Sequence, residues 1–251
     1  MAGLTTIRPS LDFPPAIVSP LRIISSMATR QLLAALAPAW TAQRGADAPP
    51  LAVESVGGVD AARRVQAGER FDLVVLASDA IAKLMAQGLL VAGTARPLVD
   101  SPMVAAQAET ATPWALDSPA ALRGALLAAP RIGYSTGPSG QALLALIQAW
   151  GLHEALAPKL LQAPPGVPVG QLIASDEVAL GFQQLSELIH VPGLRILGPL
   201  PGEHAITTTF VSAQGLDPAQ PAEVAALQDF FASPATLALK LAQGMSAPAA
   251  G

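Results

Sequence analysis

The segment "FDLVVLASDAIAKLMAQGLL" at residues 71–90 decides the fold class. Its first part, 71–78, is an almost unbroken apolar run, which is typical of a strand buried on both faces of a parallel sheet. The second part, 79–90, places apolar side chains at helical spacing, and Asp79 is well suited to cap that helix. The segment therefore predicts a strand followed by a helix, the unit from which α/β folds are built.

The same alternation recurs on both sides of this segment. We expect further strands at 21–26, 51–56, 131–135, 178–182, 193–200 and 205–212. We expect further helices at 28–43, 57–69, 118–129, 139–151, 166–175, 183–188, 221–233 and 234–243. Asp100, Ser101 and Pro102 divide the stretch 95–107 into two extended pieces. The order of the elements predicts an α/β fold with mostly parallel sheets.

Composition excludes several classes of function. The 251 residues are 51% hydrophobic and 13% charged, and the net charge is −4, which is unsuited to nucleic-acid binding. The chain has no cysteine, and its three histidines are scattered without the spacing of metal ligands. It contains neither a P-loop nor a dinucleotide-binding motif. We therefore expect no metal and no cofactor.

The first residues bear on location. Residues 1–20 form a Pro-rich arm in which Arg8 and Asp12 interrupt any apolar run of the kind that a secretory signal needs. No segment of about 18 residues is apolar enough to insert into a membrane. Taken as written, the sequence predicts a cytoplasmic protein. Removal of a signal from the start would make the same chain periplasmic.

Small polar or Gly-rich turns follow several of the predicted strands. In open α/β sheets, ligands bind beyond the carboxyl ends of the strands, where helix N-termini offer free N–H groups. These turns supply the candidate ligand-binding residues Ser25, Ser26, Gly57, Gly58, Arg63, Ser78, Ser135, Ser139, Gly140, Val169, Gln183 and Gln184. For each turn the alternative is ordinary capping of the helix that follows.

The turn "STGPSG" at 135–140 is the strongest single candidate. Its hydroxyls and glycines would let side chains and backbone N–H groups approach an anion closely. Ser139 is equally suited to cap the next helix. Arg63, beside the turn "GGVD", could clamp a carboxylate or lie in a solvated face. Gln183 and Gln184 could donate from their amides or cap a helix, whereas Glu177 and Glu187 are expected to be surface charges.

Together the segments resemble a known family. The order of "IISSMATRQLLAALAPAW", residues 54–90, "RIGYSTGPSGQALLALIQAWGL", "VALGFQQLSEL" and "LQDFFASPATLALKLAQG" is similar to that of the type II periplasmic solute-binding proteins, in particular the molybdate-binding-protein-like family. The resemblance implies a monomer with two lobes that close on a ligand around a two-strand hinge. The lobes would be 21–100 plus 204–251, and 101–203, with a disordered tail at 245–251.

Departures from the family pattern bear on the ligand. The resemblance places a Ser, a Ser and a Tyr at binding positions where this chain has Ala28, Val59 and the pair Gln183 and Gln184. A buried anion would lose donors, at roughly 1–3 kcal/mol each. We therefore expect a solute-binding protein for a small anion, an organic di- or tricarboxylate rather than molybdate. Its partner would be an ABC permease only if the protein is exported.

Two alternatives remain. The turns "GGVDAARRVQAGE" and "GFQQLSEL" resemble the aconitate isomerase-like branch of the family, which implies a cofactor-free isomerase of an unsaturated tricarboxylate. Such a reaction needs a base next to the substrate. The sequence offers only His204, Asp60 or a cleft serine for this role. A third reading is a sensor that signals by closure, and whether the chain is an enzyme is left open.

Overall fold

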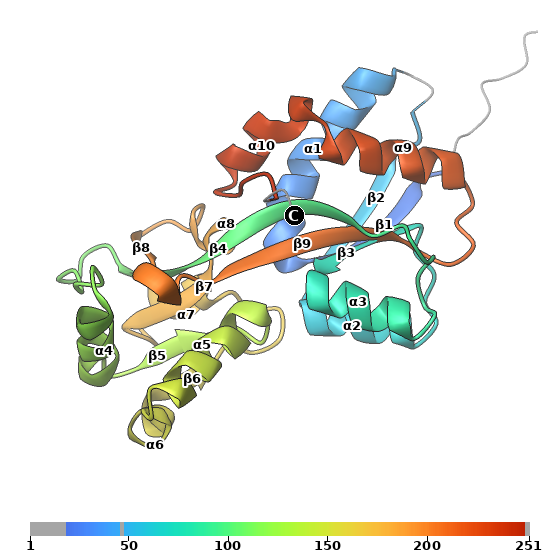
Figure 1. The fold of residues 1–251 in the computed structure, drawn as a ribbon. Helices are drawn as coiled ribbons and strands as arrows, with labels where there is room; N and C mark the ends of the chain where they lie inside the picture. Colours follow the sequence, from blue (N-terminus) through green and yellow to red (C-terminus); the bar gives the residue numbers. More distant parts are fainter. Residues whose placement is uncertain (1–18, 46–47, 249–251) are drawn as a thin grey trace, which may run out of the picture.

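The structure, a computed structural model, describes residues 19–45 and 48–248. Two α/β halves share one mixed sheet, which has nine strands in these residues (Figure 1). The strands are β1 (Leu21–Ser26), β2 (Leu51–Val56), β3 (Leu73–Ala77), β4 (Arg96–Ala108), β5 (Ile132–Tyr134), β6 (Leu160–Gln162), β7 (Leu180–Gln184), β8 (Leu194–Pro199) and β9 (Thr207–Gln214). The expected α/β fold with two halves is confirmed.

The helices fall close to where helical spacing predicts them. They are α1 (Arg30–Arg44), α2 (Gly58–Gln66), α3 (Ser78–Ala86), α4 (Pro119–Ala128), α5 (Pro138–Ala149), α6 (His153–Leu156), α7 (Val169–Ala174), α8 (Leu185–Leu188), α9 (Pro221–Ala232) and α10 (Leu237–Ala242). Short 3₁₀ turns occupy Met27–Thr29, Ala157–Lys159, Gly202–His204 and Pro234–Thr236. β6 and α6 were not predicted, because they are too short to show a hydrophobic period.

Each half has the same internal plan. β1 pairs in parallel with β2 and β3 in the first half, and β5 pairs in parallel with β6 and β7 in the second. β4 and β9 run antiparallel to these strands and to each other. The carboxyl ends of β1, β2 and β3 therefore lie at one edge of the first half, and those of β5, β6 and β7 at one edge of the second.

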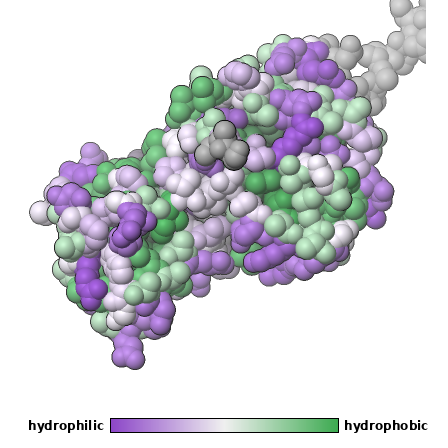
Figure 2. Space-filling view, in the orientation of Figure 1, coloured by the Kyte–Doolittle hydropathy of each residue, from purple (hydrophilic) through white to green (hydrophobic). Residues whose placement is uncertain are grey.

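β4 and β9 connect the halves. β4 pairs with β9 from Arg96 to Pro102 and with β7 and β8 from Met103 onward. The predicted break at Asp100–Pro102 is therefore wrong, because β4 runs through it. Pro102 lies where the strand changes partners, so its missing N–H removes no regular ladder bond. The space-filling view shows two rounded masses joined by a narrower waist, which these strands cross (Figure 2).

The halves have separate cores. In the first half, α1 and α9 cover one face of the sheet through Trp40, Phe230 and Phe231, while α2 and α3 cover the other (Figure 1). In the second half, α4 and α5 pack on one face around Ile132 and Phe182, and α7 and α8 pack on the other. Each half therefore packs around its own core residues.

The end of the chain differs from the expectation of a disordered tail from Met245. Met245 is buried in the first core, and Ser246 exchanges two 3.0 Å backbone hydrogen bonds with Asp100. This isolated pairing holds the chain against β4. Of the predicted N-terminal arm, residues 1–18 lie outside the described residues, as do 249–251 of the tail.

Candidate functional site

A small polar cavity lies where the two halves meet. Its volume is about 50 Å³. From the first half it is lined by Ser26, Met27, Ala28, Gly57, Gly58 and Phe210. From the second half it is lined by Ser135, Thr136, Gly137, Pro138, Ser139, Pro164, Gly166, Val167, Pro168, Gln183, Gln184 and Glu187. The turns at the strand ends therefore meet at one site.

The first-half wall consists of two strand-to-helix turns. Ser26 ends β1, and its Oγ accepts the Ala28 N–H at 3.4 Å. Gly57 is the N-cap of α2 and has no side chain that could accept a hydrogen bond. The first N–H groups of α2 can therefore donate to another acceptor. A Cβ at Gly58 would lie 3.7 Å from Ser26 Oγ, which shows how near the two turns lie.

The second-half wall is the turn "STGPSG". Ser139 does not cap α5: Gly137 is the N-cap, Pro138 is the first helical residue, and Ser139 lies buried in the first turn. Ser135 Oγ and Ser139 Oγ share a 3.0 Å hydrogen bond. Gly140 cannot carry a side chain, because a Cβ there would fall 1.8 Å from the Ser135 carbonyl oxygen. Only a glycine at position 140 therefore permits this turn, which places the hydroxyls of Ser135 and Ser139 at the cavity.

Gln183 and Glu187 form the most ordered part of the wall. The Val169 N–H donates to Gln183 Oε1 at 2.8 Å, so the amide nitrogen of Gln183 must face the other way. It donates to Glu187 Oε1 at 2.7 Å. None of the ion pairs among the described residues includes Glu187.

The protonation of Glu187 follows from this setting. Loss of water around the carboxyl raises the pKa of Glu187 to about 7, although the Gln183 amide favours the ionised form. Glu187 is therefore not the surface charge that the sequence predicts. The available signal was that Glu187 follows Gln183 by four residues, directly after the carboxyl end of a strand. At neutral pH this carboxyl can either accept or release a proton.

Gln184 adds an unused acceptor. Its Nε2 donates to Thr208 Oγ1 at 2.8 Å, while its Oε1 has no hydrogen-bond partner among the described residues. The side chain is almost completely buried and lines the cavity. Buried polar atoms are normally paired, so this oxygen is an acceptor whose hydrogen-bonding capacity is unused in the described residues.

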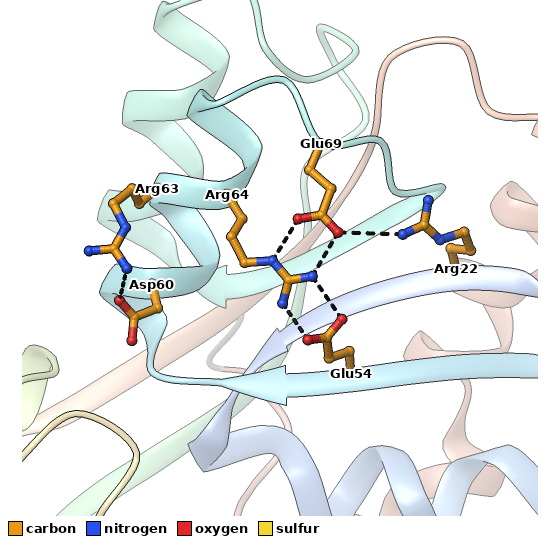
Figure 3. Close-up of polar contacts among 6 residues, drawn as sticks. All are labelled: Arg22, Glu54, Asp60, Arg63, Arg64 and Glu69. Atoms are coloured by element: carbon orange, nitrogen blue, oxygen red, sulfur yellow. Dashed lines mark hydrogen bonds and ion pairs between the residues drawn. The ribbon is translucent and has the colours of Figure 1, made fainter.

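Arg63 does not clamp the polar cavity. Its side chain is 73% exposed and its Nη2 donates to Asp60 Oδ1 at 2.7 Å. Figure 3 shows Arg63 on the opposite side of α2 from Arg64, which lies between Glu54 and Glu69 (Figure 3). Hydrogen bonds from Arg64 lower the pKa of both carboxyls and tie α2 to β2. Arg64 thus holds α2, and with it the turn at Gly57, in place, whereas the exposed Arg63 can contact groups outside the polar cavity.

The structure brings together seven of the twelve predicted residues. Ser26, Gly57, Gly58, Ser135, Ser139, Gln183 and Gln184 line the cavity. The other five lie outside its lining. Ser25 is buried against Ser55 through a 2.7 Å hydrogen bond, and Ser78 is an exposed first-turn residue of α3. The Val169 N–H donates to Gln183, and Gly140 allows the close backbone packing of the turn at Ser135. Arg63 lines a neighbouring groove.

Two expectations about local structure also change. Asp79 does not cap α3, since Ala77 is the N-cap and Asp79 lies in the first turn. Gln183 and Gln184 belong to β7 rather than to the helix predicted at 183–188, and Gln184 takes the N-cap position of α8 without a capping bond from its side chain. Of the possible bases, His204 stacks edge-on against Trp150 with ring centroids 4.9 Å apart. Neither His204 nor Asp60 lines the polar cavity.

With this geometry in hand, comparison with known families identifies the chain. The family model of bacterial extracellular solute-binding proteins matches residues 21–246. The chain belongs to this family. No helix in the described part of the protein is both long and apolar enough to cross a membrane.

Individual relatives show how far the likeness reaches. Aconitate isomerase from a Pseudomonas species is 29% identical over 219 residues, covering 86% of this chain and 83% of that protein. The periplasmic molybdate-binding protein of Azotobacter vinelandii superposes with a TM-score of 0.75 at 19% identity, covering 91% and 99% of the two chains. Iron-bound HitA of Pseudomonas aeruginosa gives 0.63 at 17% identity, covering 92% and 90%. These structures share the fold with this chain.

Proposed function

We propose that this solute-binding protein takes up a small organic anion with more than one carboxylate in the polar cavity between its halves. One observation carries the proposal. The first turns of α2 and α5, from opposite halves, meet at this cavity together with the hydroxyls of Ser26, Ser135 and Ser139. Helix N-termini and hydroxyls are neutral donors suited to a negative group.

The charge of Glu187 favours a carboxylate over molybdate. A tetrahedral oxyanion with two charges would lie against a carboxyl that is half ionised near neutral pH, and the repulsion would weaken binding. Protonated Glu187 can donate a hydrogen bond to either anion, but ionised Glu187 repels the single charge of one carboxylate group less than the two charges of molybdate. Ala28 lines the same wall and contributes no hydroxyl that an oxyanion could use.

Thermal unfolding with a panel of anions tests this function. Citrate, tricarballylate and trans-aconitate should raise the melting temperature, whereas molybdate, tungstate and sulfate should not. A ligand at a hundredfold its Kd adds about 2.7 kcal/mol, which corresponds to about 5–10 °C for a chain of this size. Ser139→Ala should reduce the shift, and Ser118→Ala, which removes a remote helix cap, should lower the baseline alone. Shifts with the oxyanions alone would refute the proposal.

A second candidate function is isomerisation of the bound carboxylate. It is favoured by Glu187, a carboxyl that exchanges its proton near neutral pH inside the cavity, and by the likeness to aconitate isomerase. In this reaction the Glu187 carboxylate takes a proton from a methylene beside a carboxylate. The electron pair shifts across the adjacent double bond, and the same carboxyl, after exchanging its proton with solvent, protonates the far carbon. Nothing is oxidised or reduced.

Proton NMR separates the two candidates. Trans-aconitate incubated with the protein in D₂O should show signals of the cis isomer and deuterium at the methylene. Glu187→Gln should abolish both changes and still bind tricarballylate, a saturated tricarboxylate that has no double bond to shift. Tight binding of trans-aconitate without any exchange would leave a pure binding protein.

The oligomeric state and the partner are also proposals. Both halves of one chain line the cavity, so no second subunit is needed to complete it, and we propose a monomer, which light scattering can test. We propose an ABC permease as the partner where the protein is exported to the periplasm. The exported protein should then stimulate ATP hydrolysis by its permease only with ligand bound.

A further inference from the structure

A second, wider cavity opens beside the polar one. Its volume is about 350 Å³, and it shares Ser26, Gly58, Gly137, Pro138 and Phe210 with the polar cavity as lining residues. The polar cavity, at about 50 Å³, has room for only a few water molecules at ~10–15 Å³ each. A polycarboxylate therefore exceeds the polar cavity and must extend into the adjoining groove.

The floor of the groove is apolar. It lies between α2 and α3 and is formed by Val59, Ala62, Leu76, Ala80, Leu84 and Phe210. Val59 is 54% exposed, which makes it one of the few large apolar side chains left uncovered among the described residues. The carbon skeleton of a ligand would cover this surface and gain from its burial.

Two cations stand on the walls of the groove. Arg63 comes from α2 and Lys83 from α3. Each has an acidic neighbour on its own helix: Asp60 lies 2.7 Å from Arg63, and Asp79 lies 3.7 Å from Lys83. Both cationic side chains are about three-quarters exposed. Exposed ion pairs of this kind are weak, so either cation can turn to a ligand carboxylate.

We infer that the ligand is an extended dicarboxylate or higher carboxylate, with one carboxylate in the polar cavity, its carbon chain over Val59, and a second carboxylate held by Arg63 and Lys83. This inference rests on the proposed function and narrows it to a class of ligand. Arg63 is then a specificity residue that acts at the far end of the ligand. This role explains why Arg63 does not line the polar cavity but does line the groove beside it.

Titration calorimetry with ligands matched in length tests the inference. Glutarate and adipate should bind at least tenfold more tightly than pentanoate and hexanoate, the monocarboxylates with the same numbers of carbon atoms. Arg63→Met and Lys83→Met should each remove several-fold of this preference, and leave the weak affinity for monocarboxylates unchanged. Arg70→Met is a matched control, because Arg70 is an exposed arginine paired with Asp217 and lines neither cavity.

The outcomes separate the inference about the second carboxylate from the proposed function of carboxylate binding. Equal affinity for mono- and dicarboxylates would overturn this inference and leave carboxylate binding intact. A loss of the same size for both ligand classes in Arg63→Met would also overturn it, because Arg63 would then act on the fold or on the first carboxylate. Absence of binding by every carboxylate would overturn the proposed function, and the inference with it.

Discussion

Gln183 donates through Nε2 to Oε1 of Glu187 over 2.7 Å, and the Val169 N–H fixes the amide in that orientation. The relationship couples the backbone at the start of α7 to the one carboxyl that lines the polar cavity. Because the Gln183 amide can only donate towards Glu187, Oε1 of Glu187 accepts this hydrogen bond. Its other oxygen is left to exchange a proton with a ligand.

The first prediction concerns stability and pH. The pKa of Glu187 is raised from 4.5 to about 7, so between these values the folded state holds a proton that the unfolded state releases. Stability should therefore fall as pH rises from about 4.5 to about 7, by about 3 kcal/mol, and stay level above that. Glu187→Gln should remove this fall. Urea unfolding at several pH values measures it.

Glu177→Gln is the matched control, because Glu177 is an exposed glutamate on the same half. Its curve of stability against pH should follow that of the unmodified protein. If Glu187→Gln gives that same curve, the carboxyl is solvated and its role in proton exchange is refuted.

A second prediction separates two glycines of the cavity turns. Gly140→Ala should destabilise the protein by more than 1 kcal/mol, because its Cβ would overlap the Ser135 carbonyl oxygen. Gly58→Ala should fold at least as well, since alanine is the better helix former and its Cβ has ordinary contacts. That methyl group would project towards Ser26 Oγ and weaken ligand binding. Melting temperatures with and without citrate measure both effects, and intact binding by Gly58→Ala would argue against this wall.

The third prediction concerns the contact between the halves. Ser186 Oγ donates to the Ala28 carbonyl oxygen at 2.8 Å, and both residues are buried. Ser186→Ala leaves that carbonyl without this donor and should cost about 1–3 kcal/mol. Ser175→Ala, an exposed serine in the same half, should cost less than half as much. Equal losses in chemical unfolding would show that the contact contributes nothing specific.

A fourth prediction follows from the ion pair on α2. Asp60→Asn removes the competitor of a ligand carboxylate for Arg63. Affinity for adipate should rise about 1.4–5-fold, the range expected from an exposed pair worth 0.2–1 kcal/mol. The rise should shrink as salt increases, because the groups are exposed. Calorimetry at two salt concentrations measures this, and weaker adipate binding in the variant would count against Arg63 as a ligand contact.

Much of the fold is local in origin and so could be predicted. Segment 71–90 contains its own strand run and helical period, and Ser118 with Pro119 begins α4 as the sequence indicates. The continuity of β4 could not be predicted from Pro102. It depends on which strands pair on either side of that residue, and these partners come from distant parts of the chain.

The site was predicted unevenly for a related reason. Turns such as Gly57–Gly58 and Ser135–Ser139 can be predicted from their content of glycine and serine. The parallel strands before them end at the edge of the sheet where these turns line the cavity. Glu187 gives a weaker signal, its position four residues after Gln183, because a glutamate on a short helix is ordinarily solvated. Glu187 is half-buried at the cavity that both halves line, and its orientation comes from Gln183. Likewise, the direction of Arg63 depends on Asp60 one turn away.

The most direct measurement of the central claim is calorimetric titration of the purified protein with tricarballylate and, separately, with molybdate. Tricarballylate offers three carboxylates and cannot be isomerised, so it reports binding alone. The account predicts saturable binding of one tricarballylate per chain, weakened by Ser139→Ala, and no measurable heat with molybdate. Saturable binding of molybdate with none of tricarballylate would contradict it.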